Sequence, residues 1–222
     1  MDYEFSLNVV LQFLPDLLLG LRNTVLISII GILLATVFGV VLALARVSRW
    51  RPLSLLAAGY VAFIRATPLL VQIYFLFYGL PEFGILFPPF LVAVLALTLN
   101  SGAYAGEIIR AGIESIHQTQ YEAADSLGMT YSQKMRHVIL PQAFRKIFPP
   151  LIGQGSYLVK DSALISVMGA FDLTKAATTF QAVTFRPLEA FLPVMALYLG
   201  LILTFIYGSA FLDRRLRKWA TV

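Results

Sequence analysis

NTVLISIIGILLATVFGVVLALA, residues 23–45, is an uncharged run of 23 residues between Arg22 and Arg46. A membrane-spanning helix needs about 20 mostly apolar residues to cross roughly 30 Å of hydrocarbon, so this run is long enough. The whole chain agrees, because 59% of its 222 residues are hydrophobic and only 13% are charged. Soluble domains carry about a quarter charged residues. The sequence therefore predicts an all-α integral membrane protein.

Four more segments predict further spans. Residues 83–106 and 190–212 are uncharged and of similar length. Two other segments are long enough to cross but contain charges: residues 60–81 with Arg65, and residues 147–171 with Lys160 and Asp161. If either segment were not a span, the basic loops would no longer lie on the same side of the membrane. We therefore expect five transmembrane helices in a single domain covering residues 1–222.

The basic residues indicate the orientation. A net charge of +5 would be compatible with nucleic-acid binding, but in a membrane protein positive charge reports topology first, so no nucleic-acid partner is expected. With five spans, 12 of the 17 basic residues share one side: Arg46, Arg49, Arg51, Arg110, Lys134, Arg136, Arg145, Lys146, Arg214, Arg215, Arg217 and Lys218. This places the N-terminus outside and the C-terminus in the cytoplasm. The first 24 residues lack a basic start and a cleavage site, so we expect an interfacial lead-in and not a signal peptide.

A polar stretch interrupts the spans on the cytoplasmic side: QTQYEAADSLGMTYSQKMRHVILPQ, residues 118–142. Capping-box spacing occurs twice in it, at Thr119 with Glu122 and at Thr130 with Gln133. Gly128 lies between them, where a left-handed C-terminal cap would be needed, and Pro141 is expected to limit the second helix. The pattern predicts a helical hairpin. Helices this short are marginal alone, so either a partner holds them or this is an ordinary helical loop.

The stretch resembles a known motif. EAADSLGMTYSQKMRHVILP is similar to the EAA motif of ABC-importer permeases: Glu-Ala-Ala, three residues, Gly, nine residues, Ile, any residue, Leu-Pro. The matching residues are Glu122, Ala123, Ala124, Gly128, Leu140 and Pro141, while Val138 stands where isoleucine is usual. FIRATPLLVQIYFLFYGLP, LNSGAYAGEIIRAGIESI and LVKDSALISVMG also resemble the polar amino acid uptake permeases of bacteria. The likeness extends from about Leu17 to Leu212.

The resemblance implies a function and a set of partners. The chain would be the permease subunit of an importer for a polar amino acid, a multi-pass protein of the bacterial cytoplasmic (inner) membrane surrounded by membrane lipid. The hairpin would be the coupling helix that docks on a cytoplasmic ATP-binding-cassette ATPase. A second permease copy or paralogue and an external solute-binding protein would complete the assembly.

The motifs of catalysis are missing from the sequence. It has no G-x-x-x-x-G-K-[ST] phosphate loop, so ATP and Mg would be used by the partner ATPase and no cofactor is expected in this chain. It has no cysteine, and its two histidines, His117 and His137, do not form a metal site. We therefore expect no metal and no catalytic residue. The alternative function is an ion-coupled secondary transporter or channel that uses Lys160 and Asp161.

These two charged residues lie deep in the fourth span. They follow Lys146 by 14 to 15 residues, which is roughly 20 Å at 1.5 Å per residue. Ionisable side chains in a bilayer mark pathways or structural pairs, and neighbours along a helix do not face each other. Lys160 and Asp161 therefore either contact the charged ends of an amino acid or pair with other helices. The family resemblance favours the first role for Asp161.

Asn100 and Glu107 lie on the third span. The Gly-x-x-x-Gly spacing of residues 102–106 is typical of close helix packing, so Asn100 either packs there or contacts a ligand. Glu107 either pairs with Arg110 one turn away or forms a buried pair with Arg65. In the second case the pair would close the inner half of a pathway.

Prolines predict where the helices are irregular. Thr67-Pro68 is expected to kink the second span, and Pro149 with Pro150 to distort the start of the fourth. Broken helices line substrate cavities in transporters, although membrane helices in general tolerate proline. The candidate substrate contacts are Asp161, Lys160, Asn100, Glu107 and Thr67. The outer loop, residues 172–189, is a candidate docking surface for the solute-binding protein or else a solvated linker.

Overall fold

The structure, a computed structural model, describes residues 4–219, with side chains described up to Phe211. Within this range it contains helices and no strand, which confirms the all-α prediction. The α-helices are α1 (Leu7–Arg46), α2 (Arg51–Ala66), α3 (Leu69–Tyr74), α4 (Pro89–Glu114), α5 (Gln118–Ser126), α6 (Tyr131–Lys134), α7 (Leu140–Asp161), α8 (Leu173–Thr184) and α9 (Pro187–Trp219). Two π-turns, Phe75–Gly79 and Met135–Ile139, and two 3₁₀ segments, Leu80–Phe83 and Ser162–Met168, extend or join them.

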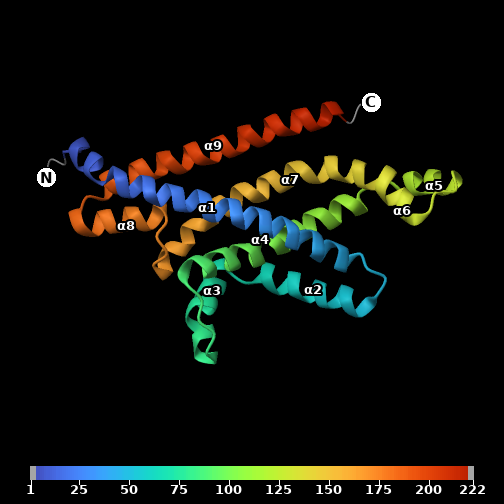
Figure 1. Ribbon diagram of the computed structural model, residues 1–222, viewed down its shortest axis with the longest axis horizontal. Coiled ribbons are helices and arrows are strands. Elements are labelled where there is room, and N and C mark those ends of the chain that lie inside the picture. Colours follow the sequence, from blue (N-terminus) through green and yellow to red (C-terminus); the bar gives the residue numbers. More distant parts are fainter. Residues whose placement is uncertain (1–3, 220–222) are drawn as a thin grey trace.

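The long helices lie lengthwise in one bundle. Figure 1 shows α1, α4, α7 and α9 along the long axis with α2 beside them, α8 at one end, and α5 and α6 at the other. The α1–α2 connection lies at the same end as α5 and α6, in agreement with the shared side that the charge count requires. Four residues of that count, Arg214, Arg215, Arg217 and Lys218, have side chains outside the described part.

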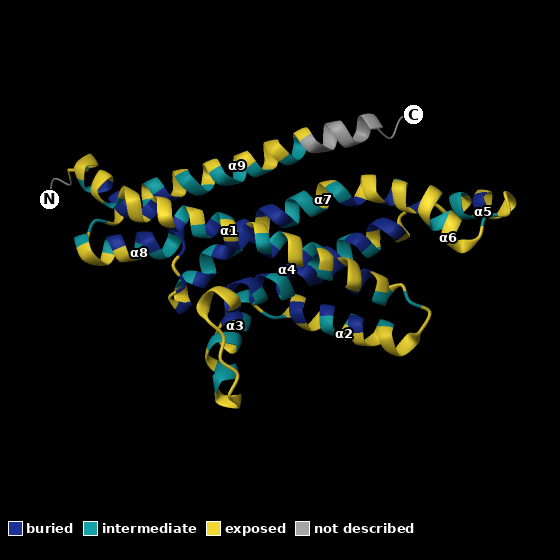
Figure 2. Cartoon of the chain, viewed as in Figure 1, coloured by how far each residue is buried: buried dark blue, intermediate teal, exposed yellow. Residues whose placement is uncertain are grey.

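Close packing of α1 against α4 forms the centre of the bundle (Figure 2). A Cβ added at Gly39 of α1 would lie 2.7 Å from Ala105 Cβ, and one added at Gly106 would lie 3.0 Å from Leu42 Cβ. Only glycine permits this approach of the two backbones. A Cβ at Gly102 would meet Phe38. The packing role predicted for residues 102–106 is thus confirmed.

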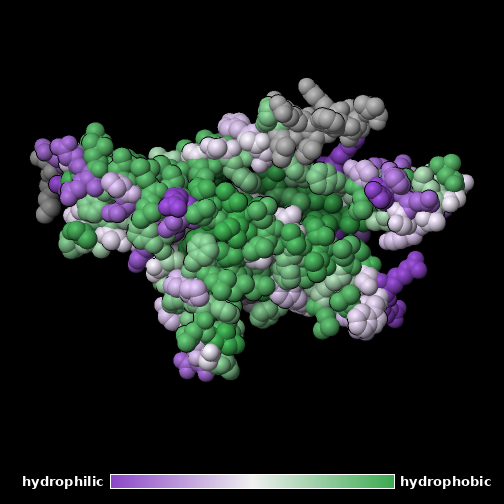
Figure 3. All heavy atoms as spheres, in the orientation of Figure 1, coloured by the Kyte–Doolittle hydropathy of each residue, from purple (hydrophilic) through white to green (hydrophobic). Residues whose placement is uncertain are grey.

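Three helices are long and apolar enough to cross a membrane on their own: α1, α4 and α9. The pair formed by α2 and the segment from Leu69 to Phe83 meets the same criterion only when the two are taken together, and it is bent by 105°. By length and composition alone, the described residues hold three spans, or up to four when the bent pair counts as one, and α7 does not meet these criteria. The predicted count of five is therefore not confirmed. Figure 3 shows an apolar flank with hydrophilic residues gathered toward the two ends, as expected for a bundle in a membrane.

The bend lies where the sequence predicts it. α2 ends at Ala66, and Thr67 takes an extended backbone, φ −113° and ψ 141°, because the ring of a following proline disfavours the helical conformation. Residues 69–83, which we call the arm, then project sideways from the bundle (Figure 1). The predicted kink is confirmed, and residues 60–81 are not one straight helix.

The second predicted irregularity is wrong. Pro149 and Pro150 lie inside α7, which continues without interruption from Leu140 to Asp161. The chain departs from α-helical geometry only after Asp161, where residues 162–168 tighten into a 3₁₀ segment that Gly169 ends with φ +82°. The prolines therefore do not break the helix that carries the buried charges.

Residues 172–189, the predicted outer loop, contain a packed helix and are not a solvated linker. Asp172 caps α8 by accepting a hydrogen bond from Lys175 N at 2.7 Å, and Leu173, Ala177 and Phe180 of α8 are fully or almost fully buried. The ring of Phe180 stacks on Phe13 of α1 with centroids 4.2 Å apart. The lead-in is correspondingly the first part of the continuous helix α1.

Asp172 gives the protein a specific pH dependence. Its side chain is fully buried, and this desolvation raises the pKa of its carboxyl group from the usual 3.8 to about 6. The folded state therefore holds a proton that the unfolded state releases between about pH 4 and pH 6. Stability should fall as the pH rises through this window, by at most about 3 kcal/mol.

The measurement is the apparent Tm of the detergent-solubilised protein from pH 4.5 to 7.5 for the wild type and for Asp172→Asn. Asparagine is also a good helix cap, so the variant keeps the cap and loses only the titration. We expect the wild-type Tm to fall relative to that of the variant as the pH rises. Parallel curves would show that Asp172 does not titrate in this range.

Candidate functional site

A polar cavity of about 570 Å³ lies where the α2–arm break faces α4 and α7. Its lining residues are Arg65, Ala66, Thr67, Pro68, Leu69, Asn100, Tyr104, Gln154, Tyr157 and Asp161. Of the predicted substrate contacts, Thr67, Asn100 and Asp161 line it, while Lys160 and Glu107 do not. The broken helix therefore does border a cavity, as the sequence predicts.

The cavity lining contains one basic and one acidic side chain. Asp161, at the end of α7, is half-buried, and Arg65, near the end of α2, has about half of its side chain exposed. The Arg65 guanidinium lies over the ring of Tyr104, 5.2 Å from its centroid, a favourable cation–π position. Such a lining suits a small zwitterion, because Arg65 can bind a carboxylate and Asp161 can accept from an ammonium group.

Lys160 lies outside this lining. Its side chain is exposed, and its Nζ is 4.2 Å from the centroid of the Tyr157 ring, one turn earlier on the same helix. Tyr157 itself lines the cavity. Lys160 and Asp161 thus have different surroundings, in agreement with their adjacent positions on one helix. Lys160 lies beside the cavity, with the Tyr157 ring as its neighbour there.

Glu107 is the centre of an arginine cluster at the hairpin end of α4. Its carboxylate accepts from Arg46 Nε at 3.2 Å and from Arg110 Nε and Nη2 at 3.1 and 2.9 Å. Arg65 Nη1 is 3.9 Å from Glu107 Oε2. The expected contact between Arg65 and Glu107 is present, but Arg46 and Arg110 are the nearer partners. Closure of a pathway by this pair stays a prediction.

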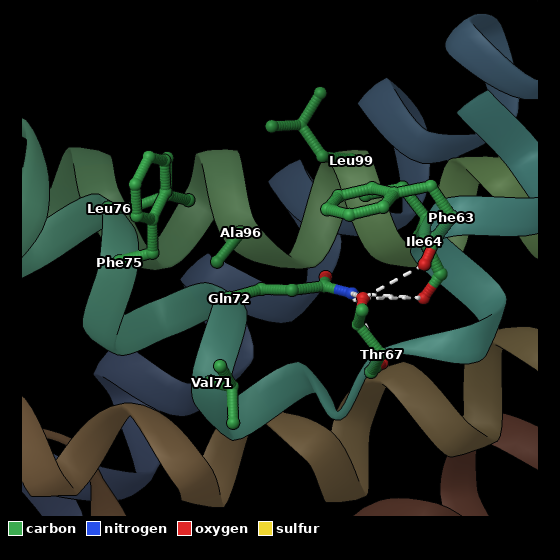
Figure 4. Close-up of a pocket in the computed structure, with 9 residues that line it drawn as sticks. All are labelled: Phe63, Ile64, Thr67, Val71, Gln72, Phe75, Leu76, Ala96 and Leu99. Carbon is green, nitrogen blue, oxygen red and sulfur yellow. Dashed lines mark hydrogen bonds between the residues drawn. The ribbon is translucent and has the colours of Figure 1, made fainter. Parts of the chain in front are cut away.

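Sequence reasoning missed Gln72, which connects the break to the cavity. Its side-chain nitrogen Nε2 donates to Ile64 O at 2.9 Å and to Thr67 Oγ1 at 2.8 Å, as Figure 4 shows. Its Oε1 accepts from Asn100 Nδ2 at 3.0 Å. The sequence does hold one signal for this role: Gln72 is a polar residue in an otherwise apolar run, four residues after Pro68. Arg65 was expected only as a partner of Glu107 and not as a lining residue. Gln154 and Tyr157, which also line the cavity, carry no comparable signal.

Gln72 also lines an apolar groove of about 370 Å³. Figure 4 shows the groove between the end of α2, the arm and α4. Its lining is Phe63, Ile64, Thr67, Val71, Gln72, Phe75, Leu76, Ala96 and Leu99. Thr67 borders both spaces.

The hairpin of residues 118–142 has one of its two predicted capping boxes. Thr130 and Gln133 form the second box, with Gln133 Oε1 accepting from Thr130 N at 2.9 Å. The first prediction is wrong, because α5 begins two residues earlier than a Thr119 cap requires and is capped by His117, whose Nδ1 accepts from Thr119 N at 3.3 Å. Thr119 therefore lies inside the first turn of α5.

Gly128 makes the corner of the hairpin as predicted. Its φ is +71°, and Gly128 N donates to Asp125 O at 2.9 Å while Met129 N donates to Ala124 O at 3.1 Å. These two bonds define a Schellman C-terminal motif. An ion pair between Lys134 and Asp125 joins the two sides of the corner.

The second helix of the hairpin does not stop at Pro141, which corrects that prediction. α6 passes through the π-turn Met135–Ile139 directly into α7, and Pro141 lies in the first turn of α7. A π-turn changes the backbone pairing locally, and the missing N–H of proline is tolerated where the regular ladder is already interrupted. The hairpin is thus continuous with the helix that carries Asp161.

The motif residues are distributed between the bundle and the surface. Ala124 is almost fully buried, and Tyr121 packs against the cluster of Ile116, Ile139 and Ala143. The other motif residues are exposed: Glu122, Ala123, Gly128, Leu140 and Pro141. Leu127, predicted to share a face with Tyr121 and Ala124, is 76% exposed. One side of the hairpin therefore attaches to the bundle and the other presents a free surface.

Residues 31–218 match the family described as "Binding-protein-dependent transport system inner membrane component". The chain is 38% identical to the arginine transport system permease protein ArtQ of Bacillus subtilis (strain 168) over 98% of this chain and 99% of the relative. It is 42% identical to the L-cystine transport system permease protein TcyB of the same strain over 75% of this chain and 71% of the relative.

Solved structures agree with the sequence comparisons. A chain of an amino acid ABC transporter crystallised with histidines superposes with a TM-score of 0.90 at 38% identity, covering 96% of this chain and 100% of that one. A chain of the MetNI methionine ABC transporter, at 18% identity, superposes with a TM-score of 0.76 over 90% of this chain and 96% of that one. The second likeness concerns the fold alone.

Proposed function

The chain belongs to the family of binding-protein-dependent transport system inner membrane components, and we propose that it is the permease subunit of an ATP-binding-cassette importer for a polar amino acid. The observation that carries this proposal is the cavity at the helix break, which has Arg65 and Asp161 on one lining. A zwitterion needs one group of each sign. The relatives named for arginine and cystine transport support an amino acid as the substrate.

The exposed side of the hairpin is the surface proposed to dock on the ATPase. Glu122, Ala123 and Gly128 lie there, and small residues allow a partner surface to approach closely. Since α6 continues into α7 through the π-turn, a movement of the hairpin is transmitted to the helix that bears Asp161. Closure of the ATPase dimer would pull two such hairpins together and open the cavity outward. ATP and Mg would be bound by the ATPase, and this chain would supply no catalytic residue.

A second permease copy or paralogue is proposed to cover the exposed face of the arm. The arm and the turn after it expose large apolar side chains: Val71, Phe75, Tyr78, Phe83 and Leu86. Lys160 is also exposed, at a depth where an uncovered charge is costly. Both features are expected of a chain that shares its pathway with a second subunit.

The opposite end of the bundle is proposed to receive the solute-binding protein. Ser6 N donates to the buried Glu189 at 3.1 Å, and Arg186 Nη1 donates to the same carboxylate at 2.8 Å. These bonds tie the N-terminal segment to α9 and stiffen the end that carries α8. Val183 and Phe185 at the end of α8 remain exposed there.

The ion-coupled alternative needs Lys160 and Asp161 to act as one site. They do not share the cavity lining, since Lys160 lies beside Tyr157 and Asp161 faces the cavity. The geometry therefore supports the ATP-driven importer better.

The first test is purification of the tagged chain from its native membrane in a gentle detergent, with co-purifying proteins identified by mass spectrometry. A phosphate-loop ATPase is expected, and a second permease sequence would define a heterodimer. The assembly is then reconstituted in liposomes with its solute-binding protein to measure ATP-dependent uptake of labelled arginine, glutamine, cystine and glutamate. A chain that purifies alone and takes up none of them would overturn the proposal.

A further inference from the structure

The helix break creates backbone acceptors that need new donors. In a regular helix the N–H of residue 68 would donate to Ile64 O, but Pro68 has none. Gln72 Nε2 takes its place at 2.9 Å from Ile64 O, and it also lies 3.2 Å from Thr67 O. A buried carbonyl without a donor is costly. The Gln72 side chain thus replaces the backbone donor that the break removes.

These contacts fix the orientation of the Gln72 amide. Carbonyl oxygens can only accept, and Thr67 Oγ1 uses its own proton on Phe63 O at 3.0 Å, so it accepts from Gln72 as well. A flipped amide would place Oε1 against these acceptor oxygens. The Gln72 oxygen must therefore point the other way, toward α4.

The orientation is passed on to Asn100. Because Gln72 Oε1 is an acceptor, Asn100 must turn its Nδ2 toward it, and the two atoms are 3.0 Å apart. Asn100 is only 5% exposed and lines the polar cavity. No described residue donates a hydrogen bond to its Oδ1. This oxygen is also not one of the fully buried side-chain atoms that lack a partner, so it is accessible from the cavity. The polar atom that Asn100 offers to the cavity is thus an acceptor.

We propose that Gln72 is a positioning residue that holds the Asn100 amide with its oxygen toward the cavity, where it accepts from the ammonium group of the transported amino acid. Asn100 Oδ1 and the Asp161 carboxylate are then two acceptors on one lining, and an ammonium group has three donors. Arg65 then remains to bind the carboxylate of the amino acid. This inference rests on the proposed function, and it assigns Asn100 to ligand contact instead of packing alone.

The test is a double-mutant cycle on amino-acid binding to the assembled importer in detergent. Labelled arginine, glutamine, cystine and glutamate are the probes, and the Kd is measured for each one that binds the wild type. Gln72→Met and Asn100→Ala should each weaken binding about tenfold, the cost of one charge-assisted hydrogen bond. The double variant should be no weaker than either single variant, because Gln72 acts through Asn100.

Two controls separate positioning from a general loss of structure. Gln12→Met makes the same replacement at an exposed position of α1 and should leave the Kd unchanged. Asn100→Ser keeps a hydroxyl group, which can donate to Gln72 Oε1 and still offer an acceptor to the cavity. It should therefore lose less affinity than Asn100→Ala, which offers neither. The second control remains decisive if Gln72→Met fails to fold.

The possible outcomes point to different conclusions. Normal affinity in Gln72→Met, losses that add in the double variant, or equal losses in Asn100→Ser and Asn100→Ala would each overturn the positioning role while the importer proposal stands. If the wild-type assembly binds none of the four amino acids, the proposed function itself is wrong and this inference with it.

Discussion

Replacing Gly128 by valine is expected to reduce ATP-driven uptake by at least about tenfold while leaving membrane insertion intact. Gly128 has φ +71°, a conformation that costs an ordinary L-residue roughly 1–2 kcal/mol and a β-branched residue more. Valine would therefore open the Schellman motif that joins α5 to α6. The apolar spans do not involve this corner, so insertion should be normal. The measurement is uptake by reconstituted vesicles, normalised to the amount of permease inserted.

The matched control is Gly128→Asn, because asparagine tolerates the left-handed conformation. No heavy atom lies within 4 Å of a Cβ added at Gly128, so neither side chain meets a steric obstacle and only the backbone preference differs. Asparagine should retain most of the uptake. Equal uptake in the two variants would show that the corner geometry is not needed for coupling. Glu122→Ala, at an exposed position of the same hairpin, should also lower uptake if the hairpin docks on the ATPase.

The sequence was sufficient for features set by local chemistry. The bend at Thr67-Pro68 and the corner at Gly128 follow from the backbone preferences of proline and glycine, which act wherever those residues occur. The N-terminus of α5 was misassigned because His117 and Thr119 both can cap within two residues of each other. When two neighbouring residues can both cap a helix, the sequence alone does not show which of them does, so the predicted helix end is uncertain by one or two residues.

Features that depend on two distant segments were harder to predict. Gln72 lies in an apolar run, and its role exists only because the 105° bend brings it back to Ile64 and next to Asn100. The separation of Lys160 from Asp161 followed from helix geometry, but which of them faces the cavity depended on how α7 packs on α4. The π-turn before Pro141 has no sequence signal apart from the proline itself.

Replacing Asp161 by asparagine is expected to reduce uptake by about tenfold to a hundredfold, the range for losing a hydrogen bond between charged groups. Asp161 is the one acidic residue in the cavity lining, and asparagine keeps its size while removing its charge. The hairpin and the arm are untouched by this change. The ATPase should therefore still co-purify with the variant at the wild-type ratio, and direct binding of the amino acid should fall together with uptake.

Lys160→Gln at the neighbouring position distinguishes the two transport mechanisms. Lys160 lies beside Tyr157 and outside the cavity lining, so in an ATP-driven importer its loss should change substrate binding far less than the loss of Asp161. An ion-coupled transporter that uses both charges as one site would lose uptake equally in the two variants. The Gly128→Val variant should behave in the opposite way to Asp161→Asn, binding the amino acid normally but failing to move it. Gly128 lies in the hairpin that leads into α7, and Asp161 lies at the far end of α7, so the two changes affect separate steps of one cycle. Loss of binding in Gly128→Val with full binding in Asp161→Asn would therefore place recognition outside the cavity.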